Sequence, residues 1–273
     1  MATKGFAPAK INLTLHVTGQ RADGYHLLDS LVAFADVGDQ LEFEPGSDLS
    51  ISVSGEHASG VPTDARNLVW KAAEATGWSG SIALDKALPH GAGIGGGSSD
   101  AAAMLRHAQA QSFDFPSDLP VSLGADIPVC MMAKAARMRG IGEQVTAMTL
   151  PELPALLVNP GVEVPTGAVF KAMESRQNPQ MPDDIPVFEG VADCALWLSD
   201  QRNDLQGPAI GIAPQIGRVL DELTGTREVL LARMSGSGST CFALYPSLKA
   251  AHFAAYEIGA AHPDWWCRAT QLS

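Results

Sequence analysis

Apolar and polar residues alternate near the start of the chain. Apolar residues occupy every second position from 11 to 17, and Lys10, Asn12 and two further polar residues fill the positions between them. A period of two is typical of a strand, so this pattern predicts a strand over 10–17 with Lys10 and Asn12 on the same face. Shorter patterns of the same kind predict strands at 40–44, 49–54 and 81–85.

Helical spacing of apolar residues follows these strands. A helix is predicted over 67–76, with Gly77 to end it. In the second half, strands are predicted at 155–158 and at 240–245, and a helix and a short strand complete the chain. Further helices are predicted at 166–175, 190–199 and 208–223. The polar, proline-containing segment 176–186 predicts a long loop.

The predicted secondary structure is interrupted after residue 150, where Pro151 and Pro154 lie close together. Prolines at such a break favour a boundary between domains. The 273 residues are also enough for two domains of ordinary size. We therefore expect an N-terminal domain over 1–150 and a C-terminal domain over 151–273, both with helices and strands.

Composition narrows the class of protein. Hydrophobic residues make up 46% of the chain and the formal net charge is −12, which indicates a folded protein and argues against a nucleic-acid binder or a polybasic membrane anchor. The four cysteines are far apart, so we expect buried free thiols. With no signal-peptide pattern and no apolar run of about 18 residues, we expect a cytoplasmic protein without a membrane partner.

A glycine-rich segment precedes a helical pattern at 101–108. Such a segment offers backbone N–H groups and the positive end of the helix dipole, and its glycines let a phosphate approach the backbone. We expect Asp100 to point away from this loop, because a carboxylate there repels phosphate. A flexible linker is the alternative. The expected phosphate-binding residues are Pro89, His90, Gly91, Ala92, Gly93, Ile94, Gly95, Gly96, Gly97, Ser98 and Ser99.

Two other phosphate loops fit the sequence less well. The G-x-x-x-x-G-K-[ST] pattern of P-loop NTPases is absent, because no lysine follows a glycine in this segment. Gly91, Gly93 and Gly96 satisfy the G-x-G-x-x-G pattern of dinucleotide-binding folds, with Asp114 near the distance of the ribose-binding acid. Asp114 does not follow a predicted strand, however, so this match is weak.

Asp126 and the segment 234–240 are the other features that could belong to a site. Asp126 precedes Ile127 and Pro128, and the proline favours a turn beside the acid by disfavouring helix at Ile127. The segment 234–240 is a Gly/Ser loop between two predicted strands. By itself, an aspartate at a turn is usually a capping residue, and the segment 234–240 fits either a flexible hairpin or a backbone wall beside a ligand.

Three motifs in this order resemble the GHMP kinase superfamily. They are PAKINLTL, PHGAGIGGGSSDAA and MSGSGSTCFAL, and together they extend over nearly the whole chain. The segments TGQRADGYHLLDSLV, LGADIPV and RGIGEQV are similar to the branch of the superfamily in the non-mevalonate isoprenoid pathway. That branch phosphorylates the 2-hydroxyl of a cytidine diphosphate derivative of methylerythritol.

The resemblance implies an α+β fold with two domains. The N-terminal domain is expected to be like domain 2 of ribosomal protein S5 and the C-terminal domain ferredoxin-like, with the active site in the cleft between them. Transferred to this sequence, the catalytic pair of the superfamily falls on Lys10 and Asp126. The substrate-binding positions fall on Asn12, Tyr25, His26, Thr166, Phe170, Gly236 and Ser237.

The function implied is phosphoryl transfer from ATP, with Mg²⁺, to a small-molecule acceptor. The resemblance assigns no metal-binding side chain, and we expect a monomer or homodimer without a nucleic-acid partner. Alternatives are another small-molecule kinase of the superfamily, acting on mevalonate, homoserine or a sugar, and a non-catalytic ligand sensor on the same fold. A third is a nucleotide-dependent oxidoreductase.

Overall fold

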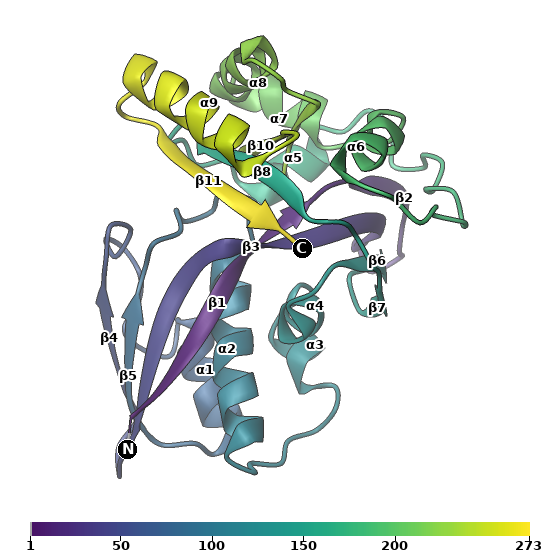
Figure 1. Ribbon diagram of the computed structural model, residues 1–273. Coiled ribbons are helices and arrows are strands. Elements are labelled where there is room, and N and C mark those ends of the chain that lie inside the picture. Colours follow the sequence, from purple (N-terminus) through teal and green to yellow (C-terminus); the bar gives the residue numbers. More distant parts are fainter. Residues whose placement is uncertain (1) are drawn as a thin grey trace. The chain divides into compact units, whose positions relative to one another are not determined.

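The computed structural model describes residues 2–273 (Figure 1). The chain divides into two compact units, each built from several segments. Unit 1 contains the N-terminal residues up to Lys10, Val37–His90 and Gly95–Ala133, and unit 2 contains Ile11–Asp36, Gly91–Ile94 and Lys134–Ser273. The units therefore do not coincide with halves of the chain, and the boundary at 150/151 stays a prediction about the two family domains.

Unit 1 combines a small sheet with four helices. The strands are β1 (Thr3–Asn12), the second part of β3 (His26–Pro45), β4 (Ser50–Ser54) and β5 (Gly80–Asp85). β5 pairs with β4 in parallel and with β3 in antiparallel orientation. The helices are α1 (Leu68–Thr76), α2 (Gly96–Ala110), α3 (Leu119–Leu123) and α4 (Ile127–Met132). α2 packs against both α1 and α4.

Local signals determine the limits of α1. The side chain of Asn67 accepts a hydrogen bond from the N–H of Val69 at the N-terminus of the helix. Gly77 ends the helix in the left-handed conformation, with φ of 71°, which glycine adopts without strain. The predicted helix over 67–76 with Gly77 at its end is confirmed.

Unit 2 contains two groups of strands. β2 (His16–Gln20), the first part of β3, β6 (Ala136–Gly140) and β7 (Gln144–Ala147) form the first. β8 (Leu153–Asn159), β9 (Leu231–Met234), β10 (Cys241–Leu244) and β11 (Trp266–Leu272) form an antiparallel sheet in the order β11-β8-β10-β9. The helices are α5 (Thr166–Lys171), α6 (Val191–Ser199), α7 (Gln206–Ile212), α8 (Gln215–Gly225) and α9 (Leu248–Ala261).

Helices α8 and α9 pack on the β11-β8-β10-β9 sheet, as Figure 1 shows in green and yellow. Val158 of β8, Ile216 and Val219 of α8 and Ile258 of α9 are buried in the same hydrophobic core. Removing this much apolar surface from water is the main source of stability for such a layer. The α+β fold expected from the sequence is confirmed.

Two predicted elements were wrong. The strand predicted over 10–17 is interrupted: β1 ends at Asn12 and β2 begins at His16. Between them, the N–H of Leu15 donates a hydrogen bond to the carbonyl of Arg202 instead of to a neighbouring strand, which interrupts the strand pairing. The helix predicted over 208–223 is two helices, because Pro214 separates α7 from α8 and a proline cannot continue the backbone hydrogen bonds of α7.

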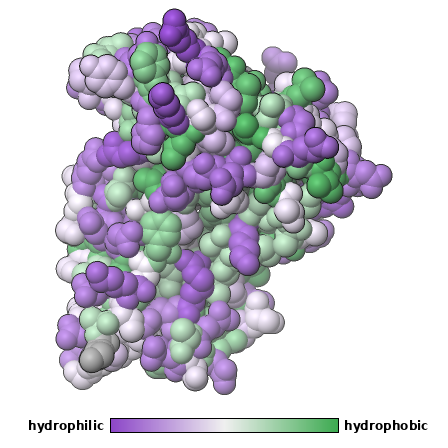
Figure 2. Space-filling view, viewed as in Figure 1, coloured by the Kyte–Doolittle hydropathy of each residue, from purple (hydrophilic) through white to green (hydrophobic). Residues whose placement is uncertain are grey.

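The surface mixes hydrophilic and apolar residues on the face drawn in Figure 2. No helix within residues 2–273 has the length and apolar character needed to cross a membrane. The four cysteines are free, and all but the half-buried Cys267 are buried, as the sequence predicted.

Candidate active site

Lys10 and Asp126 form an ion pair in unit 1. Lys10 Nζ lies 2.7 Å from Asp126 Oδ2, and the side chains are 4% and 38% exposed, respectively. Asp126 stands at the N-terminus of α4, but its side chain makes no capping hydrogen bond. The turn predicted beside the acid is present at Ala125 and Asp126, but the expectation that Pro128 keeps Ile127 out of a helix was wrong, because Ile127 begins α4. Pro128 is tolerated there since a proline in the first turn loses no helix hydrogen bond.

Helix α2 connects the two elements that carry this pair. The hydroxyl of Ser99 donates to the carbonyl oxygen of Pro8 in β1, at 2.6 Å. The guanidinium of Arg106 donates to the carbonyls of Phe6 in β1 and Cys130 in α4, at 2.8 and 2.5 Å. These hydrogen bonds attach both β1 and α4 to α2. Lys10 and Asp126 are therefore carried by elements whose relative positions are fixed.

The glycine loop lies next to Lys10 at Gly95. Gly95 has φ of 67° and precedes the first residue of α2. A Cβ at Gly95 would lie 3.2 Å from Cβ of Lys10, so the loop backbone passes beside the lysine stem. The first N–H groups of a helix have no partner within it. The start of α2 can therefore bind phosphate next to the ion pair.

The middle of the loop belongs to unit 2, where it packs against the third glycine-rich segment. Gly93 and Gly236 have φ of 73° and 55°. A Cβ at Gly93 would meet the carbonyl oxygen of Ser235 at 2.5 Å, and a Cβ at Gly236 would meet that of Gly93 at 2.7 Å. The Ser235 hydroxyl donates to the Gly93 carbonyl at 2.9 Å. Only glycine permits so close an approach of two backbones.

Asn12, Thr166 and Ser237 are held by hydrogen bonds in unit 2. The backbone N–H of Asn12 donates to Ser235 Oγ at 3.0 Å, and its side-chain amide donates to Ser30 Oγ at 2.8 Å. The hydroxyls of Thr166 and Ser237 lie 2.8 Å apart. The third glycine segment thus connects Asn12 to the start of α5.

His26 and Phe170 stack on each other, with ring centroids 4.4 Å apart and an angle of 20° between the planes. His26 Nε2 is buried and has no hydrogen-bond partner. Burial, and then the charge of Arg176, lower the pKa of His26 below its ordinary value of 6.5. Tyr25 precedes this pair and is 58% exposed. These rings offer apolar faces to a planar ligand, whereas His26 Nε2 is not accessible to one in this arrangement.

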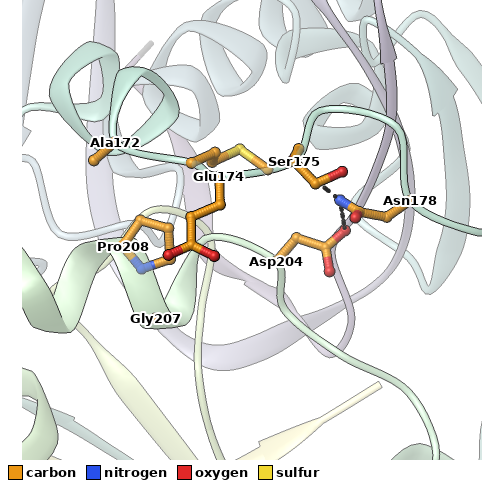
Figure 3. Close-up of a pocket in the computed structure, with 8 residues that line it drawn as sticks. Ala172, Glu174, Ser175, Asn178, Asp204, Gly207 and Pro208 are labelled. Carbon is orange, nitrogen blue, oxygen red and sulfur yellow. Dashed lines mark hydrogen bonds between the residues drawn. The ribbon is translucent and has the colours of Figure 1, made fainter.

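A pocket of about 410 Å³ in unit 2 is lined by residues that follow α5, among them Glu174 and Asn178, and by Asp204, Gly207 and Pro208 (Figure 3). The amide of Asn178 donates to Asp204 Oδ2 and to the carbonyl of Ser175 on one side of it. Asp204 Oδ2 also accepts the N–H of Val17 at 2.7 Å. These bonds attach the segment after α5 to β2, and none of the predicted site residues lines the pocket.

Two buried residues below the glycine loop, Asp39 and Lys86, were not among the candidates predicted from the sequence. Their side chains pair with each other, and Lys86 also pairs with Asp100. The side chain of Asp100 is buried against Lys86, whose Nζ lies close to Gly96 at the end of the loop. Lys86 could have been suspected from its place just before the loop, but nothing in the sequence near Asp39 indicates its partners.

Two family models match parts of this chain. The chain matches the family GHMP kinases N terminal domain over residues 67–135 and GHMP kinases C terminal over residues 188–264. These matches include the glycine loop with Asp126 and the third glycine segment, respectively.

Similar proteins span nearly the whole chain. A protein of Dinoroseobacter shibae named 4-diphosphocytidyl-2-C-methyl-D-erythritol kinase is 58% identical, over 98% of this chain and 94% of its own. One of Cereibacter sphaeroides with the same name is 53% identical, over 97% of each. A crystal structure of 4-(cytidine 5'-diphospho)-2C-methyl-D-erythritol kinase is 34% identical with a TM-score of 0.75, over 99% of both chains. This chain therefore belongs to the 4-diphosphocytidyl-2-C-methyl-D-erythritol kinase family of the GHMP kinases.

Proposed function

We propose that this protein, an ATP-dependent kinase, transfers the γ-phosphoryl group of ATP to the 2-hydroxyl of 4-diphosphocytidyl-2-C-methyl-D-erythritol, in non-mevalonate isoprenoid biosynthesis. The observation that carries the proposal is the Lys10–Asp126 ion pair beside Gly95. A carboxylate, a buried ammonium group and a phosphate-binding helix start are the groups that such a transfer needs in one place.

Asp126 is the proposed base for the acceptor hydroxyl. Its carboxylate is partly exposed, so a hydroxyl can approach it while one oxygen remains paired with Lys10. Because phosphoryl transfer passes through a loose transition state, the hydroxyl becomes acidic as the new bond forms, and a carboxylate can then accept its proton. Lys10 orients Asp126 and attracts the negative charge on the transferred group. In a second role that fits the same geometry, Asp126 only orients the hydroxyl.

The triphosphate of ATP is proposed to bind along residues 89–99. The N–H groups at the start of α2 would bind its oxygens, and the glycines let the backbone approach them. No three His, Cys, Asp or Glu side chains within residues 2–273 form a metal-binding cluster. We propose that Mg²⁺ arrives on the triphosphate and keeps water ligands, as it commonly does in proteins. No step assigned here to a side chain depends on it.

The cytidine group is proposed to bind at Tyr25, His26 and Phe170. Rings with centroids 4.4 Å apart leave no space for a base between them, so His26 and Phe170 cannot enclose the cytosine as they stand. We propose that the base stacks on Tyr25 and on the other face of Phe170. The His26 ring must then shift so that Nε2, which is buried in this structure, can accept a hydrogen bond from the base. Asn12, Thr166, Gly236 and Ser237 would bind the rest of the substrate.

The net charge of −12 supports a small-molecule substrate rather than nucleic acid as the ligand. We propose that the protein acts in the cytoplasm as a monomer or homodimer.

Identifying the product tests the proposal. The protein is incubated with ATP, Mg²⁺ and the cytidine substrate, and the product is examined by ³¹P and ¹³C NMR. We expect one new phosphomonoester signal, coupled to the carbon that bears the 2-hydroxyl. Phosphate on another hydroxyl, or hydrolysis of ATP without a phosphorylated product, would contradict the proposal. The Asp126→Asn variant provides the control for contaminating kinases.

A further inference from the structure

Three charged side chains are buried together below the glycine loop in unit 1. Lys86 Nζ lies 2.8 Å from Asp100 Oδ2 and also pairs with Asp39 Oδ2. The side chains of Lys86, Asp39 and Asp100 are at most 4% exposed. Removing charges from water is costly even when they are paired, and it often gives no net stability. A buried cluster of this kind therefore calls for an explanation other than stability.

The cluster is attached to both ends of the loop. Asp39 Oδ1 accepts the backbone N–H groups of Ala87 and Leu88, at 2.7 and 2.9 Å, just before the loop begins at Pro89. Asp100 follows the last loop residue, Ser99, within α2. Lys86 joins the two carboxylates and so fixes the spacing between the two ends of the loop.

The cluster also lies directly beneath the start of α2. A Cβ placed on Gly96, the first residue of the helix, would be 3.5 Å from Lys86 Nζ and 3.8 Å from Asp39 Oδ2. The charge of the cluster is therefore close to the N–H groups that would face a triphosphate. In so buried a place, water screens that charge poorly.

Two carboxylates share one ammonium group, so the cluster carries a net charge of −1 if both carboxylates are ionised. Asp100 Oδ1 is buried and has no hydrogen-bond partner. Burial raises the pKa of Asp100 to about 8; Lys86 opposes this rise and Asp39 adds to it. Lys86 and Asp39 are the charged groups that act on Asp100. At neutral pH, a proton on Asp100 leaves the cluster without net charge.

We propose that Asp39, Lys86 and Asp100 are positioning residues for ATP: they hold the two ends of the glycine loop at the spacing that binds the triphosphate, and they bind ATP best when Asp100 is protonated. This inference rests on the proposed function, because ATP must be the ligand of the loop. It assigns no contact between these side chains and ATP.

The binding of ATP as a function of pH tests this inference. The dissociation constant is measured by isothermal titration calorimetry at pH 7.0, 8.0, 9.0 and 9.5 with constant free Mg²⁺, in the wild type and in Asp100→Asn. If bound triphosphate raises the pKa of Asp100 by about one unit, the affinity of the wild type falls by up to about tenfold across this range. Asp100→Asn, which cannot ionise, should bind ATP within about threefold of the wild type at pH 7.0 and lose little affinity above it.

Two further variants complete the experiment. Asp114→Asn alters an exposed carboxylate after α2 and should keep the pH dependence of the wild type. Asp39→Asn weakens the attachment of Ala87 and Leu88, so it should raise KM for ATP at least about fivefold with KM for the acceptor unchanged. Thermal melting of each variant shows whether it is folded.

Opposite results would overturn the inference in distinguishable ways. If Asp100→Asn loses affinity with pH as the wild type does, or binds ATP more than tenfold more weakly at every pH while folded, Asp100 does not act as stated. If the wild type fails to bind ATP at any pH, the proposed function itself is wrong.

Discussion

Lys10 Nζ and Asp126 Oδ2 lie 2.7 Å apart, although the lysine is in β1 and the aspartate begins α4. The lysine is almost fully buried, whereas the carboxylate keeps more than a third of its surface exposed. This asymmetry leaves the carboxylate accessible to an acceptor hydroxyl and fixes the ammonium group beneath it.

Removing either member of this pair should abolish most turnover. We expect Asp126→Asn to lower kcat at least about 100-fold, the scale of general-base effects, with KM for ATP little changed. Lys10→Ala should lower kcat comparably. Because the two groups act as one unit, the double variant should be little slower than either single variant. Steady-state kinetics measure all three, and losses that multiply in the double variant would contradict a working pair.

A side chain at Gly95 should weaken nucleotide binding. Gly95→Val introduces a branched residue at φ of 67° and places its Cβ 3.2 Å from Lys10, so we expect the loop to shift and KM for ATP to rise. Gly259→Val is the control, because Gly259 lies in α9, outside the proposed site, and no atom outside that helix's own backbone would lie within 4 Å of the new Cβ. Calorimetry with ATP measures the difference. Equal affinities in the two variants would show that the loop backbone does not contact the triphosphate.

Tyr25→Ala should weaken the binding of the cytidine substrate and leave the binding of ATP unchanged. Stacking of a base on an aromatic ring contributes about 1 to 3 kcal/mol, so KM for that substrate should rise about 5- to 100-fold. KM for ATP should stay nearly constant. Tyr256→Ala on α9 is the control, because Tyr256 is also an exposed tyrosine but is outside the proposed site. A Tyr25→Ala enzyme with an unchanged KM for the cytidine substrate would exclude this residue from the site.

The cytidine substrate should bind more weakly in acid. The pKa of His26 is lowered from its ordinary value of 6.5. The ring is therefore neutral at pH 7 to 8 and becomes protonated only as the pH falls below 6.5. Protonation removes Nε2 as an acceptor, so KM for the cytidine substrate should rise in acid, below pH 6.5, and stay flat above pH 7. The profile of KM against pH should lose this rise in His26→Gln. A rise that persists in the variant would assign the titration to another group.

Local signals predicted α1 almost to the residue, because its cap residues Asn67 and Gly77 act on neighbouring backbone groups. The long loop after α5 was equally clear from its composition. The motifs that resemble known kinases gave the candidate site residues, and the structure brings Lys10 to Asp126 and His26 to Phe170.

Contacts between distant parts of the chain account for what the sequence did not predict. The strand over 10–17 was broken by a bond from Leu15 to Arg202, which no local pattern reveals. The partnership of Asp39 with Lys86 is likewise set by the sheet that brings β3 next to β5. The stacking of His26 on Phe170, which changes where a base can fit, also depends on long-range packing.

A coupled assay of ADP release tests the central claim most directly. The protein is supplied with ATP, Mg²⁺ and one acceptor at a time: 4-diphosphocytidyl-2-C-methyl-D-erythritol, mevalonate or homoserine. We expect ADP release with the first acceptor, none above background with the other two, and a loss of at least about 100-fold in Asp126→Asn. Efficient turnover of mevalonate or homoserine, or turnover of the cytidine substrate that Asp126→Asn leaves unchanged, would contradict this account of the protein.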